Sequence, residues 1–281
     1  MKEEKQNKTN EDYKFLIEKL FAKILGGRVS PEEYNQVFER VEHEIHDKPF
    51  KVAVIGQSGV GKSTTLNAIF GLENYTANLK EGTTDIIEKI FPMRDGFNLS
   101  IYDMPGLNND IRKDEEYSKL YKEILPGCDV VVYIINAHSR DFGEDCRILK
   151  EIVLPICDAN AVMDNVILAV NKIDTIGESF APDDPDYQWD YINNIPSPAL
   201  KQCIQIKITE ITSKLVDENI ILMGDNHALN PEQIVFYSAT QNFNLLSFLK
   251  AITNAGKRGW FWTSTVGIER LGKWSDKRLN L

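Results

Sequence analysis

The sequence lacks the features typical of secreted, zinc-binding and membrane-spanning proteins. Its four cysteines are scattered, with no Cys-x-x-Cys pair and no histidine at ligand spacing: Cys128, Cys146, Cys157 and Cys203. This pattern disfavours a disulfide framework or a zinc site and predicts reduced cytosolic thiols. No apolar run approaches the roughly 18 residues that a membrane-spanning helix needs. The N-terminal residues are polar and charged, so we expect no secretory signal.

An excess of positive charge is also missing. The chain has 42 acidic and 32 basic residues, a formal net charge of −10. This balance disfavours broad electrostatic attraction to nucleic acid or anionic lipid, although it allows a local basic patch. Hydrophobic residues make up 42% and charged residues 26% of 281 residues, which is typical of a soluble globular protein. The length suits one large domain, or one domain with helical additions.

What the sequence does contain is a phosphate-binding loop at residues 56–63, which fits G-x-x-x-x-G-K-[ST] at every fixed position. The β-branched run at 51–55 predicts a buried strand before it, and 64–70 predicts a helix after it. This arrangement turns backbone N–H groups and the positive end of a helix towards one anion. The expected nucleotide contacts are Gly56, Gln57, Ser58, Gly59, Val60, Gly61, Lys62, Ser63 and Thr64.

Two side chains of this loop carry chemistry. Lys62 supplies a mobile positive charge for the β- and γ-phosphates, and the Ser63 hydroxyl can bind Mg²⁺. The alternative reading of residues 56–63 is an ordinary glycine-containing turn, but such a turn does not require a lysine and a serine at these two positions.

Three more motifs follow predicted strands. Asp-Met-Pro-Gly at 103–106 follows the extended run 97–102, Asn-Lys-Ile-Asp at 171–174 follows 166–170, and Ser-Ala-Thr at 238–240 follows 234–237. All three are expected at carboxyl ends of strands, where open α/β sheets bind ligands.

The motif at 171–174 predicts which base is bound. The Asp174 carboxylate can accept hydrogen bonds from both guanine N1–H and the 2-amino group. Adenine lacks this pair of donors and would leave a buried charge unpaired, a costly mismatch. A simple polar exit from a strand is the alternative reading of this motif.

With these four motifs in order, residues 50–255 resemble the translation-factor-like class of P-loop GTPases. Gly82-Thr83-Thr84 also looks like the G-T-T of Era-like bacterial GTPases, and the phosphate loop looks closer to those of septins and immunity-associated GTPases than to that of Ras. The resemblance implies an α/β three-layer sandwich with a mostly parallel sheet. It also implies Mg²⁺-dependent hydrolysis of GTP to GDP and phosphate, and a nucleotide-dependent switch at two loops.

By this resemblance, Asn171 supports its loop and contacts the base edge, while Lys172 lies along the base face. The Ala239 N–H, between Ser238 and Thr240, is expected to meet guanine O6. Catalytic roles fall to Lys62, Thr84 and Gly106, whose N–H meets the γ-phosphate. The implied magnesium ligands are Ser63, Thr84 (with Thr83 as the alternative) and, through a water, Asp103.

The catalytic helper is not specified by the sequence. Loops at 75–82 and 106–114 are expected to be the switches, but Leu107 stands where Ras-like proteins carry a water-orienting glutamine. We therefore expect slow turnover unless a partner or dimerisation assists. Septins and immunity-associated GTPases also lack this glutamine and pair across the nucleotide face. Candidates for reaching a γ-phosphate in trans are His138, Arg140 and Arg112, although a solvated loop is the simpler reading.

These considerations leave two functions open: a switch GTPase, or a septin-like assembly protein that uses GTP as an interface ligand with little turnover. The expected domains are an N-terminal helical region at 1–48, a GTPase domain at 49–256 and an aromatic, basic extension at 257–281. The domain carries an insertion near 177–198, a candidate for family-specific recognition. The extension either packs on the N-terminal helices or meets a membrane surface or protein partner. RNA is disfavoured, and a cytoplasmic location, in part peripheral to a membrane, is expected.

Overall fold

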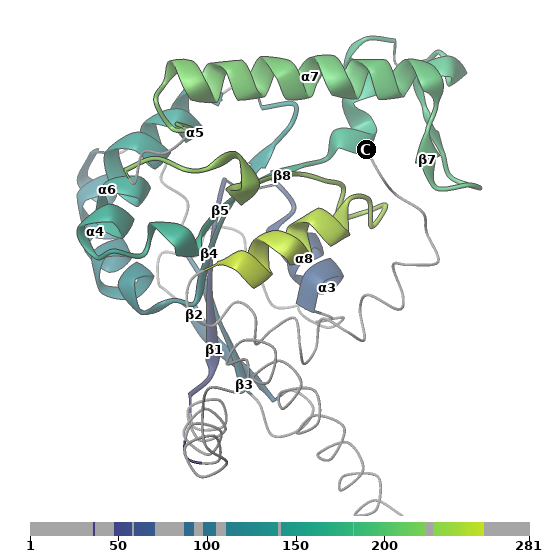
Figure 1. Ribbon diagram of the computed structural model, residues 1–281. Coiled ribbons are helices and arrows are strands. Elements are labelled where there is room, and N and C mark those ends of the chain that lie inside the picture. The colour runs from purple at the N-terminus through teal and green to yellow at the C-terminus, as the bar shows by residue number, and fades with distance from the viewer. Residues whose placement is uncertain are drawn as a thin grey trace, which may run out of the picture.

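The computed structural model describes residue 36 and residues 48–57, 59–70, 87–92, 98–104, 111–139, 142–181, 183–222 and 227–255. In these ranges a central sheet lies between two layers of helices (Figure 1), which confirms the predicted three-layer α/β sandwich. The expected N-terminal region and the extension at 257–281 lie almost wholly outside the described residues. None of the described helices combines the length and apolar character needed to span a membrane.

The main sheet has the strand order β2-β3-β1-β4-β5-β8. Only β2 runs antiparallel to its neighbour, so the sheet is mostly parallel, as predicted. Strands β1, β3, β5 and β8 coincide within a few residues with the extended or apolar runs identified in the sequence. The strands are β1 Phe50–Ile55, β2 Ile87–Pro92, β3 Asn98–Asp103, β4 Val130–Asn136, β5 Val166–Asn171 and β8 Ile234–Phe236.

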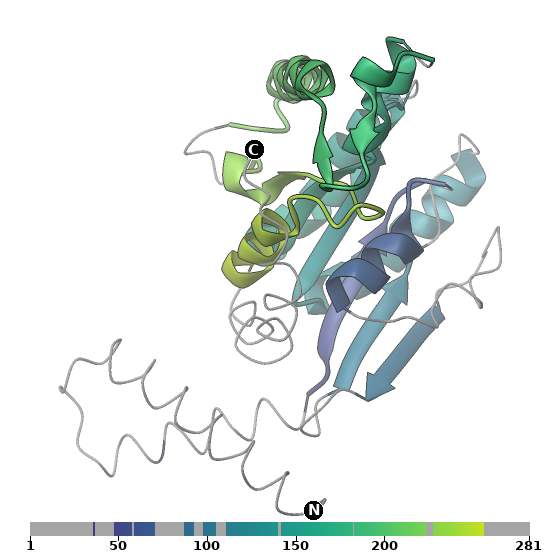
Figure 2. The same cartoon turned by 90° about the vertical axis from the view of Figure 1, so that its right-hand side faces the viewer.

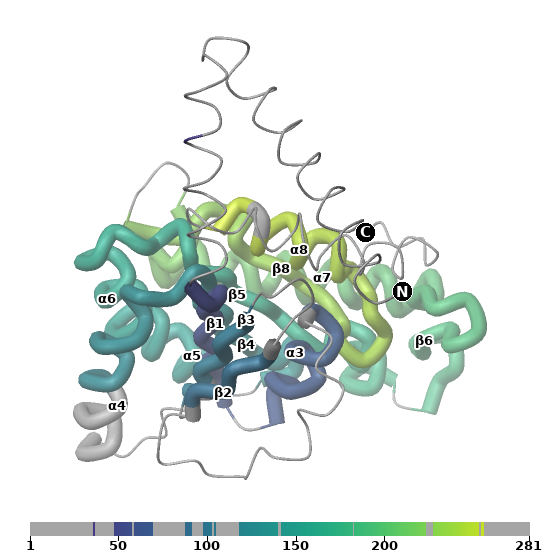
Figure 3. The backbone as a smooth tube through the Cα atoms, turned by 90° about the horizontal axis from the view of Figure 1, so that it is seen from below, coloured from purple at the N-terminus to yellow at the C-terminus, as the bar shows by residue number. Residues whose placement is uncertain are grey.

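Both faces of the sheet are covered, so its central strands are apolar at nearly every position. On β4, Tyr133 and its alternate neighbours face α4, α5, α6 and α7, whereas Val132 and its neighbours face α3 and α8. Figure 2 shows the two helical layers, and Figure 3 shows α3 beside α8. The helices are α3 Lys62–Phe70, α4 Ile111–Ile124, α5 Phe142–Ile148, α6 Leu154–Ala159, α7 Pro198–Asp217 and α8 Leu245–Asn254.

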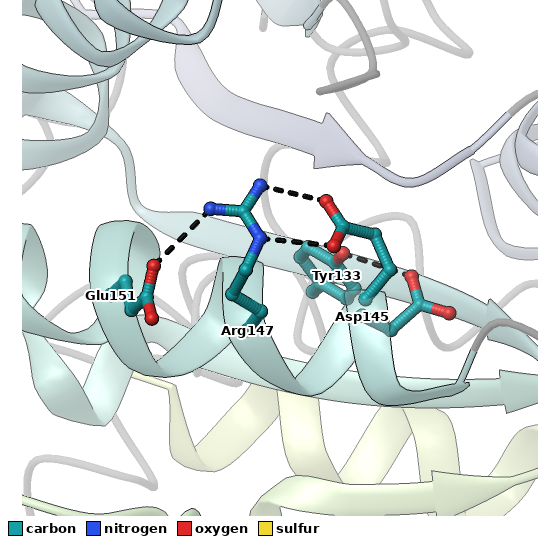
Figure 4. A network of polar contacts seen from close by, with 5 residues as sticks. Tyr133, Asp145, Arg147 and Glu151 are labelled. Carbon is teal, nitrogen blue, oxygen red and sulfur yellow. Dashed lines mark hydrogen bonds and ion pairs between the residues drawn. The ribbon is translucent and has the colours of Figure 1, made fainter. Parts of the chain in front are cut away.

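Helix α5 is fixed to the sheet by a buried polar contact (Figure 4). The Tyr133 hydroxyl donates to Asp145 Oδ1 at 3.0 Å, and Asp145 is only 1% exposed. Burial, and next the Asp145 charge, raise the pKa of Tyr133, so the hydroxyl stays a donor. Arg147 binds Glu144 of the same helix and Glu151 of the π-helical segment Leu149–Val153 that follows it.

The second predicted switch is shorter than expected. Its last residues, 111–114, are the first turn of α4 and not a loop. The reason is local: α4 contains three lysines and three glutamates, which are strong helix formers. Residues 105–110 lie outside the described ranges.

The insertion has the irregular character that its prolines predict. It contains a 3₁₀ turn, Pro185–Tyr187, and a two-stranded hairpin of β6 (Trp189–Asp190) and β7 (Ile195–Pro196). The buried Trp189 ring meets Phe243 edge-on at 5.0 Å, which anchors the hairpin beside the chain that follows β8. Helix α7 then starts at Pro198, with the Ser197 hydroxyl accepting from Leu200 N–H.

Candidate functional site

The candidate site lies at the carboxyl end of β1, the central point of the strand order. Strand β1 lies between β3 and β4 in the sheet, and open α/β sheets bind ligands in the crevice outside the carboxyl ends of such strands. The loops after β1, β5 and β8 meet here, so the fold brings together the predicted phosphate and base motifs.

The phosphate loop is built around glycines that no other residue could replace without strain. Gly61 has φ +96°, and a Cβ there would lie 2.4 Å from Asn171 Nδ2. A Cβ on Gly56, at φ +149°, would lie 2.4 Å from the Ile134 carbonyl oxygen. Gly59 also has a positive φ, +77°, but faces open space. The loop is therefore shaped both by backbone conformation and by close packing against β4 and the Asn171 loop.

Lys62 and Ser63, the predicted phosphate and magnesium residues, are the first two residues of α3. Lys62 Nζ donates to the carbonyl oxygens of Gly56 (2.9 Å) and Gln57 (3.1 Å), so the ammonium group lies across the loop. Ser63 is in the first turn of α3, which contains no acidic side chain to oppose an anion. Ser58 lies outside the described residues.

Asn171 joins the phosphate loop to the loop after β8. Its side chain is 2% exposed; Nδ2 donates to Val60 O at 2.9 Å, and Oδ1 accepts from Ala239 N–H at 3.0 Å. The supporting role expected of Asn171 is thus visible in these contacts. The expected contacts of Asn171 and Ala239 with the base stay predictions, and the Ala239 amide donates to Asn171 in this structure.

Lys172 and Asp174 lie on either side of a backbone turn. Lys172 adopts a left-handed conformation (φ 66°), and its Nζ donates to Gly59 O at 2.7 Å. Asp174 is the second residue of the 3₁₀ helix Ile173–Ser179 and is 9% exposed. A nearly buried carboxylate of this kind favours a ligand with paired N–H donors.

The predicted magnesium ligands are only partly described. The main chain of Asp103 ends β3 and pairs with Val54 of β1, which places it at the same edge of the sheet as Ser63. The Asp103 side chain, Thr84 and Gly106 lie outside the described residues. Hydroxyl and carboxylate oxygens are the donors that Mg²⁺ prefers, so this donor set fits the ion.

Tyr237 and His138 make contacts in this region that the sequence did not predict. The buried Tyr237 hydroxyl lies 2.6 Å from Thr65 Oγ1, which itself donates to Gly61 O. His138 binds Ser179 and Thr175 through its two ring nitrogens, so its imidazole is engaged within its own chain. Arg140 and the side chain of Arg112, the other candidates for action in trans, lie outside the described residues.

All four cysteines are buried free thiols. Burial raises the pKa of the Cys128 and Cys157 thiols to about 12 and that of Cys146 to about 11. These thiols stay protonated at neutral pH, which suits packing and not nucleophilic chemistry.

Comparison with known proteins matches residues 51–172 to the family described as "50S ribosome-binding GTPase". The chain is 26% identical over 119 residues to the uncharacterised protein YfjP of Escherichia coli K12, covering 42% of this chain and 41% of that protein. It is 33% identical over 143 residues to the GTPase Der of Prosthecochloris aestuarii, covering 49% of this chain and 31% of Der. The chain thus spans less than half the length of these relatives.

Among solved structures, Era of Aquifex aeolicus bound to GDP·AlF4⁻ aligns with a TM-score of 0.48 at 23% identity. The alignment covers 74% of this chain and 57% of Era.

Proposed function

Because the chain contains a P-loop GTPase domain of the translation-factor-like class, we propose that it binds and hydrolyses GTP as a nucleotide-dependent switch. The observation that carries the proposal is the Asn171 side chain, which links Val60 of the phosphate loop to Ala239 after β8. This link holds the phosphate loop, the Asp174 loop and the Ala239 amide in one arrangement. Such an arrangement can bind the two ends of a guanine nucleotide together.

Catalysis in this proposal depends on charge neutralisation and positioning. Lys62 and the amides of residues 56–64 stabilise the charge on the phosphate oxygens. Ser63, Thr84 and Asp103 would hold Mg²⁺, which would supply further charge neutralisation. The Gly106 N–H orients the γ-phosphate and connects its presence to the second switch loop.

Leu107 cannot orient a water molecule, so turnover by the isolated chain is expected to be slow. A partner protein, or a homodimer across the nucleotide face, would supply the missing group. We propose that the extension at 257–281 meets such a partner or a membrane surface, and that direct binding to nucleic acid is not its role. The chain is expected to act in the cytoplasm.

The decisive experiment compares wild type with Asp174→Asn in calorimetric titrations with GDP, ADP and xanthosine diphosphate. Wild type should prefer GDP over ADP by about a hundredfold or more, and the variant should transfer that preference to the xanthine nucleotide. Asp158→Asn, a surface carboxylate paired with His227, is the matched control and should behave as wild type. Equal binding of GDP and ADP by wild type would refute the proposal.

A second measurement separates a switch from an assembly role. The specific GTPase rate is followed over a hundredfold range of protein concentration. A rate that rises with concentration indicates assistance by self-pairing. Nucleotide that survives purification together with negligible turnover at every concentration would favour the septin-like assembly role.

A further inference from the structure

His138, which follows β4, forms hydrogen bonds with the loop that carries Asp174, the carboxylate proposed to recognise the base. His138 Nε2 lies 2.8 Å from Thr175 Oγ1, and Nδ1 lies 2.8 Å from Ser179 Oγ. Both hydroxyls belong to the 3₁₀ helix Ile173–Ser179, which begins beside Asp174. One imidazole therefore contacts both the first and the last turn of this helix.

The hydrogen-bond pattern fixes which ring nitrogen carries the proton. Thr175 Oγ1 donates its single hydrogen to Lys172 O at 3.1 Å, so it can only accept from His138. Nε2 is then the protonated nitrogen of a neutral ring, and Nδ1 accepts the hydroxyl hydrogen of Ser179. A neutral imidazole thus forms both hydrogen bonds at once, as a donor to Thr175 and an acceptor from Ser179.

His138 is itself held in place by the neighbouring strands. Its backbone N–H donates to Asn136 Oδ1 at 3.0 Å, and the preceding residue, Ala137, donates to Asn171 O at 2.9 Å. The loop that carries Asp174 is therefore anchored on both sides. Asn171 ties its start to the phosphate loop and the Ala239 amide, and His138 ties its end to the exit of β4.

We propose that His138 is a positioning residue for base recognition: by bridging Thr175 and Ser179 it holds Asp174 in the orientation that accepts the guanine donors. The inference rests on the proposed guanine-nucleotide binding and adds a residue to its specificity. It assigns His138 a role within its own subunit, on the base side of the site and not at the γ-phosphate of a partner.

The same geometry predicts a pH dependence. Protonated His138 would need Ser179 to turn its hydroxyl from donor to acceptor, and the new positive charge would compete with the base for Asp174. The charged groups that face the ring are Glu178 and Asp174, which favour its protonation, and Lys207 and Lys172, which oppose it. Burial is the largest influence and lowers the pKa of His138, so the ring is neutral at physiological pH.

The test measures the affinities of full-length protein for GDP and for inosine diphosphate, which lacks the 2-amino group that Asp174 is expected to bind. For His138→Ala we expect GDP affinity to fall about tenfold and the preference for GDP over inosine diphosphate to shrink, since one oriented hydrogen-bond pair is lost. His138→Gln keeps a donor for Thr175 and should recover part of the preference. Affinity for inorganic tripolyphosphate should not change, because the phosphate loop is untouched.

The pH dependence of GDP affinity distinguishes a positioning role of His138 from a purely structural one, which would not change this dependence. Wild-type GDP affinity should fall as pH decreases from about 7.5 to about 5.5, and His138→Gln should flatten this dependence. His227→Ala, an exposed histidine paired with Asp158, is the matched control and should keep the wild-type profile.

A double-mutant cycle of His138→Ala with Ser179→Ala tests the bridge directly. We expect the two effects on GDP affinity to be strongly non-additive, because either change breaks the same contact. Should His138→Ala and His138→Gln both keep the wild-type preference for GDP over inosine diphosphate, the inference is wrong while guanine binding stands. Absence of guanine preference in wild type would instead remove the proposed function.

Discussion

Lys172 and Gly59 lie 113 positions apart in the chain, yet Lys172 Nζ donates to the Gly59 carbonyl at 2.7 Å. This contact parallels that of Asn171 Nδ2 with Val60 O, one residue further along the phosphate loop. Two consecutive residues at the end of β5 therefore bind two consecutive carbonyls after β1. The two halves of the site are joined by side chains as well as by the sheet beneath them.

The first prediction concerns the Asn171 contacts. Asn171→Ala removes bonds to Val60 and Ala239 and leaves buried backbone groups unpaired, so it should lower the free energy of unfolding by about 2–4 kcal/mol. It should also reduce GDP affinity by at least about tenfold, because the loops lose their common anchor. Urea denaturation and calorimetry measure the two effects.

A matched control for this variant is Asn165→Ala. Asn165 makes a similar bond, Nδ2 to Cys128 O at 2.7 Å, just before the start of β5. Asn165→Ala should lower the free energy of unfolding but leave GDP affinity unchanged. Equal losses of GDP affinity in both variants would mean that general destabilisation, and not the anchor, explains the result.

The second prediction separates backbone strain from steric overlap in the phosphate loop. Gly59→Ala meets nothing within 4 Å and should cost only the strain of a positive φ, about 1 kcal/mol. Gly61→Ala adds a Cβ 2.4 Å from Asn171 Nδ2, so it should also displace that side chain and abolish nucleotide binding. The melting temperatures of Gly59→Ala and Gly61→Ala, measured with and without GDP, distinguish the two variants. Indistinguishable melting shifts would contradict the packing described for Gly61.

The third prediction concerns the insertion. Asn194 adopts φ 55°, accepts from Trp189 Nε1 and donates to Gln241 O at 3.0 Å, next to the loop at 238–240. Asn194→Gly keeps the backbone conformation but removes both bonds, so we expect a loss of about 1–2 kcal/mol in stability. GDP affinity should also weaken severalfold.

Asn193→Ala serves as the control because, among the described residues, its side chain binds Asp190 at the hairpin tip. Asn193→Ala should change the free energy of unfolding by no more than about 0.5 kcal/mol and should leave GDP affinity unchanged. If Asn194→Gly leaves GDP affinity at the wild-type level, the hairpin does not support the loop at 238–240.

The fourth prediction is a loss of stability in alkali. Burial raises the pKa of Cys157 to about 12 from its ordinary 9.0, so the folded state holds the thiol proton more tightly than the unfolded state. The resulting stabilisation is complete below pH 9 and is lost as pH rises towards 12, by about 1.4 kcal/mol per pH unit for this thiol. Urea denaturation from about pH 8 to about pH 10.5 measures the slope.

Cys157→Ala provides the comparison for this slope. The variant should be less stable at neutral pH because it leaves a small cavity, but its free energy of unfolding should fall less steeply with pH. A slope equal to that of wild type would show that the Cys157 thiol does not contribute.

Much of the fold follows from local sequence. The phosphate loop, the apolar runs that became β1 and β5, and the prolines that prevent a regular α-helix in the insertion each act within a few residues. Within the described residues, the expected loop at 106–114 was wrong at its end, because the strong helix formers that follow extend α4 back to Ile111.

By itself, the sequence determined the phosphate loop, the apolar strands and the residues that follow them, because these depend on short-range conformational preference and hydrophobic pattern. The mostly parallel sheet was implied by the family resemblance. Tertiary structure alone decided the contacts between them: Asn171 with Val60, Tyr237 with Thr65 and His138 with Thr175 are 111, 172 and 37 positions apart. These pairs form only once the strand order places β1, β4, β5 and β8 side by side. Since strand order is set by the packing of the whole core, no local pattern encodes which side chains finally meet.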